Sequence, residues 1–220
     1  MPENSKSVSL FPKIIRTFCV LLVITVCGWL VMQLEIMGGR MLQPDFGNTI
    51  PVWGSVIGVF LLSLSFGYLL GGWISNSGDR GVLLGSALFL AGVWIYFIPC
   101  MRAPVCAWLW NTGVDEKWGA LVAALILFAV PSVLLATTSP AAVRWLTSEA
   151  RKSGLVAGFV LFFSTVASFA GCIVTSFYLV LYSVRMTTRI SGGILCVVGL
   201  ALIVSGTVSR FRQSRGRKGD

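Results

Sequence analysis

Long stretches without any charged residue constrain this chain more than any other feature. One runs from residue 154 to residue 184, which is 31 residues, and another runs from residue 17 to residue 34, which is 18 residues. About 20 consecutive apolar residues form a helix that crosses the hydrocarbon core of a bilayer. At a rise of about 1.5 Å per residue, a helix over residues 154–184 exceeds a core of about 30 Å, so we expect it to tilt or protrude.

The composition agrees with a chain that lies in a membrane. Of the 220 residues, 56% are hydrophobic and 11% are charged, whereas soluble domains carry about 25% charged residues. The length accommodates about six spanning helices with their loops. We therefore predict an all-α polytopic membrane protein, a bundle of about six transmembrane helices. A kink is expected at Pro131 in the fourth of these helices. The six expected helices cover about residues 14–37, 52–74, 81–100, 118–138, 154–182 and 190–209.

The positive charges predict the orientation of these helices. With six spans, the side that holds both termini carries 12 of the 17 Lys and Arg residues, and the other side carries five. Lys and Arg concentrate in cytoplasmic loops, so both termini are expected in the cytoplasm and the protein in the plasma (inner) membrane. The twelve are Lys6, Lys13, Arg16, Arg80, Arg144, Arg151, Lys152, Arg210, Arg212, Arg215, Arg217 and Lys218, and the five are Arg40, Arg102, Lys117, Arg185 and Arg189.

This orientation divides the chain into three parts. Residues 1–13 form a cytoplasmic N-terminal segment, residues 14–209 the transmembrane domain, and residues 210–220 a basic cytoplasmic tail. The net charge of +9 does not indicate a nucleic-acid partner, because the basic residues lie in loops and in the tail rather than on one soluble face. The expected partner of most of the surface is the lipid bilayer.

Several functional classes are disfavoured by what the sequence lacks. There is no histidine, which is the commonest metal ligand and general base. The eight acidic residues are scattered, and neither a Gly-rich nucleotide loop nor a nucleophile elbow is present. We therefore expect no metal, no cofactor and no catalysis in this chain.

A candidate polar site lies near the end of the first apolar run and comprises Glu35, Arg40 and Asp45. A carboxylate inside the membrane costs free energy and often has a function. The alternative is that Glu35 lies at the membrane interface, within reach of water. The Gly38-Gly39 pair is expected to break the helix, which would let Arg40 turn back to pair with Glu35. The second helix is expected to shield Glu35 from lipid. The rival partners for Glu35 on the same side are Arg185 and Arg189.

Small residues recur at a spacing of four, which lets helix backbones approach each other closely in membranes. The first interpretation is packing within the chain, and the alternative is the face of a homodimer. The expected packing glycines are Gly54, Gly58, Gly67, Gly71, Gly72 and Gly158.

Two of the six cysteines fall at or in the expected loop after the third helix. Cys100 and Cys106 would then lie outside the cell, where a short disulfide loop can form in an oxidising compartment. The alternative is that they remain free thiols. The other four cysteines fall inside helices and are expected to act as small apolar residues.

A series of residues along the chain also resembles a known family. The residues are Glu35, Gly39-Arg40, Pro44, Phe46-Gly47, Trp53-Gly54, Ile57-Gly58, Leu61, Gly67-Tyr68 and Gly71-Gly72, followed by Ser139-Pro140, Arg144, Ala157-Gly158, Ser164-Thr165, Ser168, Gly171 and Thr187-Thr188-Arg189. They resemble the membrane portion of spermidine synthase-like proteins that are fused to a major-facilitator-type domain. The resemblance covers about residues 14–208 and implies a half-major-facilitator-like bundle.

Two functions are compatible with this resemblance. Fused members carry a soluble aminopropyltransferase-like domain after the last helix, and the residues that bind its substrates do not occur here, so no enzymatic activity is expected. The first hypothesis is a membrane module that anchors or serves a separate soluble synthase-like partner. The second is a small major-facilitator-type transporter of a polyamine or related amine that acts as a dimer. A transported cation should leave carboxylates inside the bundle, and Glu35 alone qualifies, near the surface, which favours the module.

Overall fold

The computed structural model describes residues 4–76, 80–147 and 153–216, and it places side chains over 17–76, 81–147 and 153–208. Within these ranges the chain is helical and contains no strand, as predicted. The elements are α1 (Asn4–Phe46), α2 (Ile50–Asn76), α3 (Arg80–Asn111), α4 (Glu116–Ala136), α5 (Thr138–Leu146), α6 (Ser153–Phe177), the short 3-10 helix η2 (Leu179–Leu181) and α7 (Val184–Gly216).

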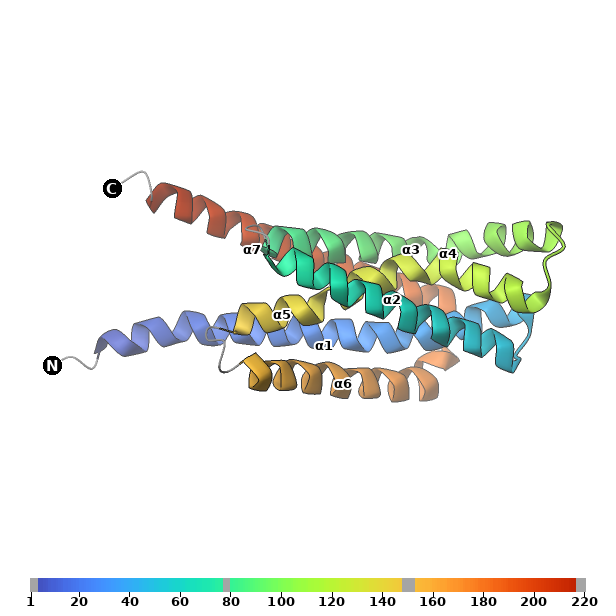
Figure 1. Cartoon of the computed structure of the whole chain (residues 1–220), viewed down its shortest axis with the longest axis horizontal. Helices are drawn as coiled ribbons and strands as arrows, with labels where there is room; N and C mark the ends of the chain where they lie inside the picture. Colours follow the sequence, from blue (N-terminus) through green and yellow to red (C-terminus); the bar gives the residue numbers. More distant parts are fainter. Residues whose placement is uncertain (1–3, 77–79, 148–152, 217–220) are drawn as a thin grey trace.

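Six stretches of the described chain are long and apolar enough to cross a membrane, which confirms the predicted fold class. Helices α4 and α5 together form one of them, and α6 with η2 forms another. Because the number of spans is even, both termini lie at the same end of the bundle (Figure 1). We call this the terminal end and the opposite one the far end. The six spans are Thr17–Phe46, Ile50–Asn76, Gly81–Asn111, Glu116–Leu146, Ser153–Leu181 and Val184–Val208.

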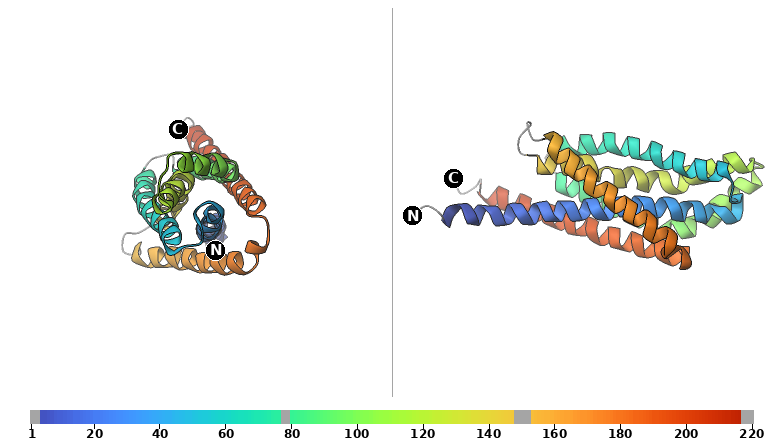
Figure 2. Two further views of the ribbon diagram at one scale, coloured as in Figure 1. Left: turned by 90° about the vertical axis from the view of Figure 1, so that its right-hand side faces the viewer. Right: turned by 90° about the horizontal axis from the view of Figure 1, so that it is seen from below.

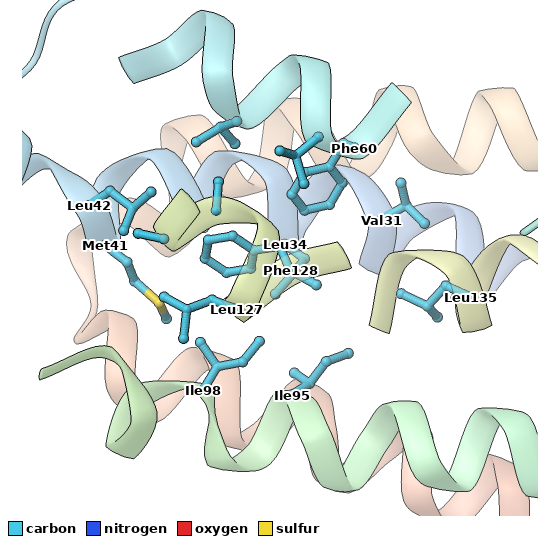
Figure 3. Close-up of a cluster of buried hydrophobic side chains, with 14 of the residues drawn as sticks. Val31, Leu34, Met41, Leu42, Phe60, Ile95, Ile98, Leu127, Phe128 and Leu135 are labelled. Carbon is cyan, nitrogen blue, oxygen red and sulfur yellow. The ribbon is translucent and has the colours of Figure 1, made fainter. Parts of the chain in front are cut away.

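Helix α1 is the centre of the bundle. Seen along the long axis, the other helices surround it (Figure 2). Its apolar side chains, such as Ile24 and Leu42, are 1% and 0% exposed. Phe60 of α2, Ile98 of α3 and Phe128 of α4 project towards it and fill the middle of the bundle (Figure 3). The interior is therefore a packed apolar core.

The predicted break at Gly38-Gly39 is wrong, because α1 continues as a helix to Phe46. The two glycines make room for aromatic rings of neighbouring helices. A Cβ atom at Gly38 would lie 3.0 Å from Cζ of Phe128, and one at Gly39 would lie 2.6 Å from Cζ3 of Trp53. Within a membrane, a helix keeps its backbone groups paired, so close packing rather than a turn explains this glycine pair.

Two expected loops are also helical. Helix α3 passes through Pro99 and Pro104 and ends only at Asn111. The residues after 138 form α5, whose Ala141 and Ala142 are buried. Helices α4 and α5 are separated by Thr137 alone, and both belong to the same span.

Helices α3 and α7 meet along a seam of glycines. On α7, Gly192, Gly199 and Gly206 follow one another at intervals of seven residues. A Cβ atom at Gly92 of α3 would lie 2.8 Å from the carbonyl oxygen of Gly192, and one at Gly85 would lie 2.9 Å from that of Gly199. The two backbones are thus in direct contact, which requires residues without side chains.

The contacts between the first three spans and the last three follow a two-fold pattern. Gly85 and Gly92 of α3 correspond to Gly192 and Gly199 of α7, each pair being 107 residues apart. Gly67 of α2 packs on α4 at Ala136, and Gly171 of α6 packs on α1 at Trp29. Trp29 precedes Ala136 by 107 residues, and Gly67 precedes Gly171 by 104 residues. Since three spans are an odd number, the second half is inverted in the membrane relative to the first. Such inverted repeats build many membrane transporters.

Candidate functional site

Most charged residues of the spans lie towards the far end, and two of them form an ion pair between α1 and α3. Arg102 of α3 donates two hydrogen bonds to Oδ2 of Asp45 on α1, from Nε at 3.0 Å and from Nη2. The Asp45 and Arg102 side chains are 24% and 30% exposed. Asp45, predicted for the polar site, is therefore part of an ion pair with Arg102, a residue that was not predicted for this site.

We expect Asp45→Asn to lower the free energy of unfolding by about 1–2 kcal/mol. The pair is less exposed than surface pairs, which contribute about 0–1 kcal/mol, yet it is not fully buried, where losing one partner costs about 3–5 kcal/mol. Unfolding in detergent micelles by added denaturing detergent, followed by circular dichroism, measures the difference. Asp115→Asn is the control, because Asp115 is exposed and its side chain makes no capping hydrogen bond. A loss no larger than that of the control would contradict the prediction.

The expected Glu35–Arg40 pair does not form. Along a continuous helix, residues five positions apart do not face each other, unlike residues three or four apart. Arg40 instead donates from Nη1 to the carbonyl oxygen of Val180 in η2, which ties the connection between α6 and α7 to α1. Glu35 is half-buried and has no ion pair with any residue whose side chain the structure describes.

Neither of the two rival arginines forms an ion pair with Glu35 in the described part of the chain. Arg189 lies between α7 and α3, where its guanidinium carbon is 5.7 Å from the ring centroid of Tyr96 and its Nη2 donates to Sγ of Cys100 at 3.3 Å. Arg185 is exposed.

The predicted disulfide between Cys100 and Cys106 is wrong. Both residues lie on the continuous helix α3, and both are free thiols. Six residues of helix separate their Cα atoms by about 9 Å along the axis, whereas a disulfide requires less than about 7 Å. Cys106 is buried and Cys100 is exposed, so their side chains leave the helix on different faces.

The predicted packing glycines divide into two groups. Gly71 of α2 packs against α4 and α5, since a Cβ atom there would lie 2.5 Å from the carbonyl oxygen of Thr137, and Gly67 packs just as closely. The second group has no heavy atom within 4 Å of an added Cβ, so the interpretation as packing within the chain is wrong for it. Its members are Gly54, Gly58, Gly72 and Gly158.

A buried polar cluster between α1 and α7 was not predicted. Trp29 donates from Nε1 to Oε1 of Gln33 at 2.9 Å, and Gln33 donates from Nε2 to Oγ of Ser191 at 2.7 Å. Ser191 in turn donates to the carbonyl oxygen of Thr187 at 3.0 Å. Gln33, inside the first apolar run, could have indicated this cluster, because an amide in hydrocarbon needs a hydrogen-bond partner on another helix.

The fold and these sites define a class: the chain is a multi-pass α-helical membrane protein with a filled apolar centre and polar contacts between helices. Comparison with protein-family models, with curated proteins and with solved structures found no match. We therefore infer the function from the geometry of the chain itself and from the resemblance of its sequence to the membrane portion of spermidine synthase-like proteins.

Proposed function

We propose that this protein is a membrane module that anchors or serves a separate soluble partner, of the synthase-like kind that the sequence resemblance implies. The observation that carries the proposal is the filled centre of the bundle. Leu127, Phe128 and Ile98 are 0% exposed and fill the centre of the single chain, which blocks a transport path through one copy (Figure 3). A transporter of cations needs carboxylates along such a path, whereas an anchor needs none.

The distribution of charge supports the same proposal. In the predicted topology, the side that holds both termini carries 12 of the 17 basic residues in the sequence. Helices α1 and α7 both extend beyond the other helices at the terminal end (Figure 1). A partner in the cytoplasm would meet these two helix ends first.

The proposal is tested by fractionating native cells with and without this protein. We expect a soluble synthase-like protein to sediment with membranes in the presence of the chain and to move to the soluble fraction when the chain is deleted. Re-expression of the chain should restore the membrane fraction. If no such protein changes fraction, the anchoring function is wrong.

The second candidate function is transport of a polyamine or related amine by a dimer. Two observations favour it: the inverted two-fold pattern of helix contacts is common among transporters, and Glu35 is half-buried without an ion pair in the described part of the chain. The open glycines Gly54 and Gly58 of α2 would then lie at the face towards a second copy.

Uptake of labelled spermidine separates the two functions. Transport predicts uptake several-fold above that of cells with an empty vector, and loss of this uptake in Glu35→Gln, with Glu116→Gln as a control because Glu116 is exposed in the first turn of α4. The anchoring proposal predicts uptake equal to that of the empty vector for all three proteins.

The proposed orientation places both termini in the cytoplasm. This orientation is based on the excess of Lys and Arg on the side that holds both termini, because such residues are retained on the cytoplasmic side. A reporter that is active only in the cytoplasm should be active when fused after Asp220 and inactive when inserted near Asp115, between α3 and α4. Activity at both positions, or at neither, would contradict the orientation.

A further inference from the structure

A small cavity lies where α1, α3 and α7 meet, beside the buried polar cluster. Its polar wall consists of Gln33, Thr188 and Ser191, whose exposed fractions are 5%, 2% and 8%. The volume open to the centre of a water-sized molecule is about 10 Å³, which is about what one water molecule requires. The apolar wall consists of Leu30, Leu34, Met37 and Ile95.

The polar wall has hydrogen-bonding capacity that the helices leave unused. Gln33 Nε2 has two N–H groups and donates one of them to Ser191. Thr188 Oγ1 donates to the carbonyl oxygen of Val184 at 2.8 Å, which leaves its lone pairs available. Ser191 Oγ accepts one hydrogen bond and donates one, so one lone pair remains. The wall thus offers one donor and two acceptors.

We propose that this cavity is a binding site for one water molecule. The water accepts a hydrogen bond from the second N–H of Gln33 Nε2 and donates to Thr188 Oγ1 and Ser191 Oγ. Two to four hydrogen bonds are usual for a buried water. An amide N–H without a partner in an apolar interior is costly, and the water removes this cost while it links α1 to α7.

The chemistry of the wall excludes the other small ligands. The amide N–H groups of Gln33 do not bind a cation, and none of the lining residues is a carboxylate. An anion would need a lysine or an arginine, and none lines the cavity. A polyamine is far larger than a volume that holds a single water. The site is therefore independent of both functions considered above.

The test is a structure of the full-length protein in lipid nanodiscs at a resolution that reveals ordered water. We expect one peak at about 2.7–3.2 Å from both Gln33 Nε2 and Thr188 Oγ1. A map that shows ordered water elsewhere but no peak here overturns the proposal, and so does density that fits a larger molecule.

Variants of two adjacent threonines supply the matched comparison. Thr188→Val keeps the shape of the side chain but removes the acceptor, so the peak should disappear. Thr187→Val is the control, because Thr187 is also buried and also bonds to the carbonyl four residues before it, yet it does not line the cavity. A peak that remains in Thr188→Val contradicts the assigned partner. If that variant does not fold, the wild-type map alone decides.

Discussion

Replacing Gly199 with alanine is expected to lower the free energy of unfolding by about 3 kcal/mol or more. A Cβ atom at this position would lie 2.5 Å from the amide nitrogen of Phe89, 2.8 Å from its Cα and 2.8 Å from the carbonyl oxygen of Gly85. All three are backbone atoms of α3, so no side chain can rotate away, and the two helices must separate. Overpacking costs about 1–3 kcal/mol where side chains adjust, and more where they cannot.

Gly193 provides the matched control on the same helix. A Cβ atom there has no heavy atom within 4 Å, and alanine favours a helix over glycine by about 0.5–1 kcal/mol. Gly193→Ala should therefore be neutral or slightly stabilising. Both variants add one methyl group to α7 and are compared by unfolding in denaturing detergent. Equal stability of the two variants would show that the α3–α7 seam does not depend on direct backbone contact.

The number and position of the spans could be predicted from the sequence because hydrocarbon imposes a simple rule. A spanning segment must be apolar, and it must be helical to pair its own backbone groups. The same rule explains why glycine and proline residues wrongly predicted the ends of helices. Glycine and proline break helices in water, but Gly38, Pro99 and Pro104 lie inside continuous helices here, because an interrupted backbone in lipid has no water to bond with.

The partners of the polar residues could not be predicted because they come from distant parts of the chain. Asp45 pairs with Arg102, which is 57 residues away, and Gln33 bonds to Ser191, which is 158 residues away. Short-range spacing favoured Arg40 as the partner of Glu35, and the helix places these two on different faces. One long-range signal was present: the seven-residue interval of Gly192, Gly199 and Gly206 predicts a close helix seam.

Pro131 inside α4 leads to the second prediction. Proline has no N–H, so the carbonyl oxygen of Leu127, four residues earlier, lacks its usual partner within the helix. The structure supplies a replacement from α3, since Trp94 donates from Nε1 to this oxygen at 3.1 Å. The indole therefore satisfies the carbonyl that the proline leaves free, and it links α3 to α4.

We expect Trp94→Phe to lower the free energy of unfolding by about 2–3 kcal/mol. Phenylalanine keeps an aromatic ring but removes the donor, so a buried carbonyl loses its partner, at a cost of about 1–3 kcal/mol, and the smaller ring leaves part of the contact unfilled. The control is Trp108→Phe, because Trp108 is 56% exposed on the same helix and should change stability by no more than about 0.5 kcal/mol.

A double-mutant cycle with Pro131→Ala isolates the hydrogen bond from the loss of volume. Alanine at 131 brings an N–H that bonds to Leu127 within the helix, so the donor of Trp94 is no longer needed. Trp94→Phe should then cost about 1 kcal/mol less in the Pro131→Ala background than in the wild type, which is within the range of couplings between residues in contact. The comparison holds whether Pro131→Ala itself stabilises or destabilises the protein. If the two changes were additive, Trp94 would contribute only packing, and the carbonyl of Leu127 would have to be satisfied in another way.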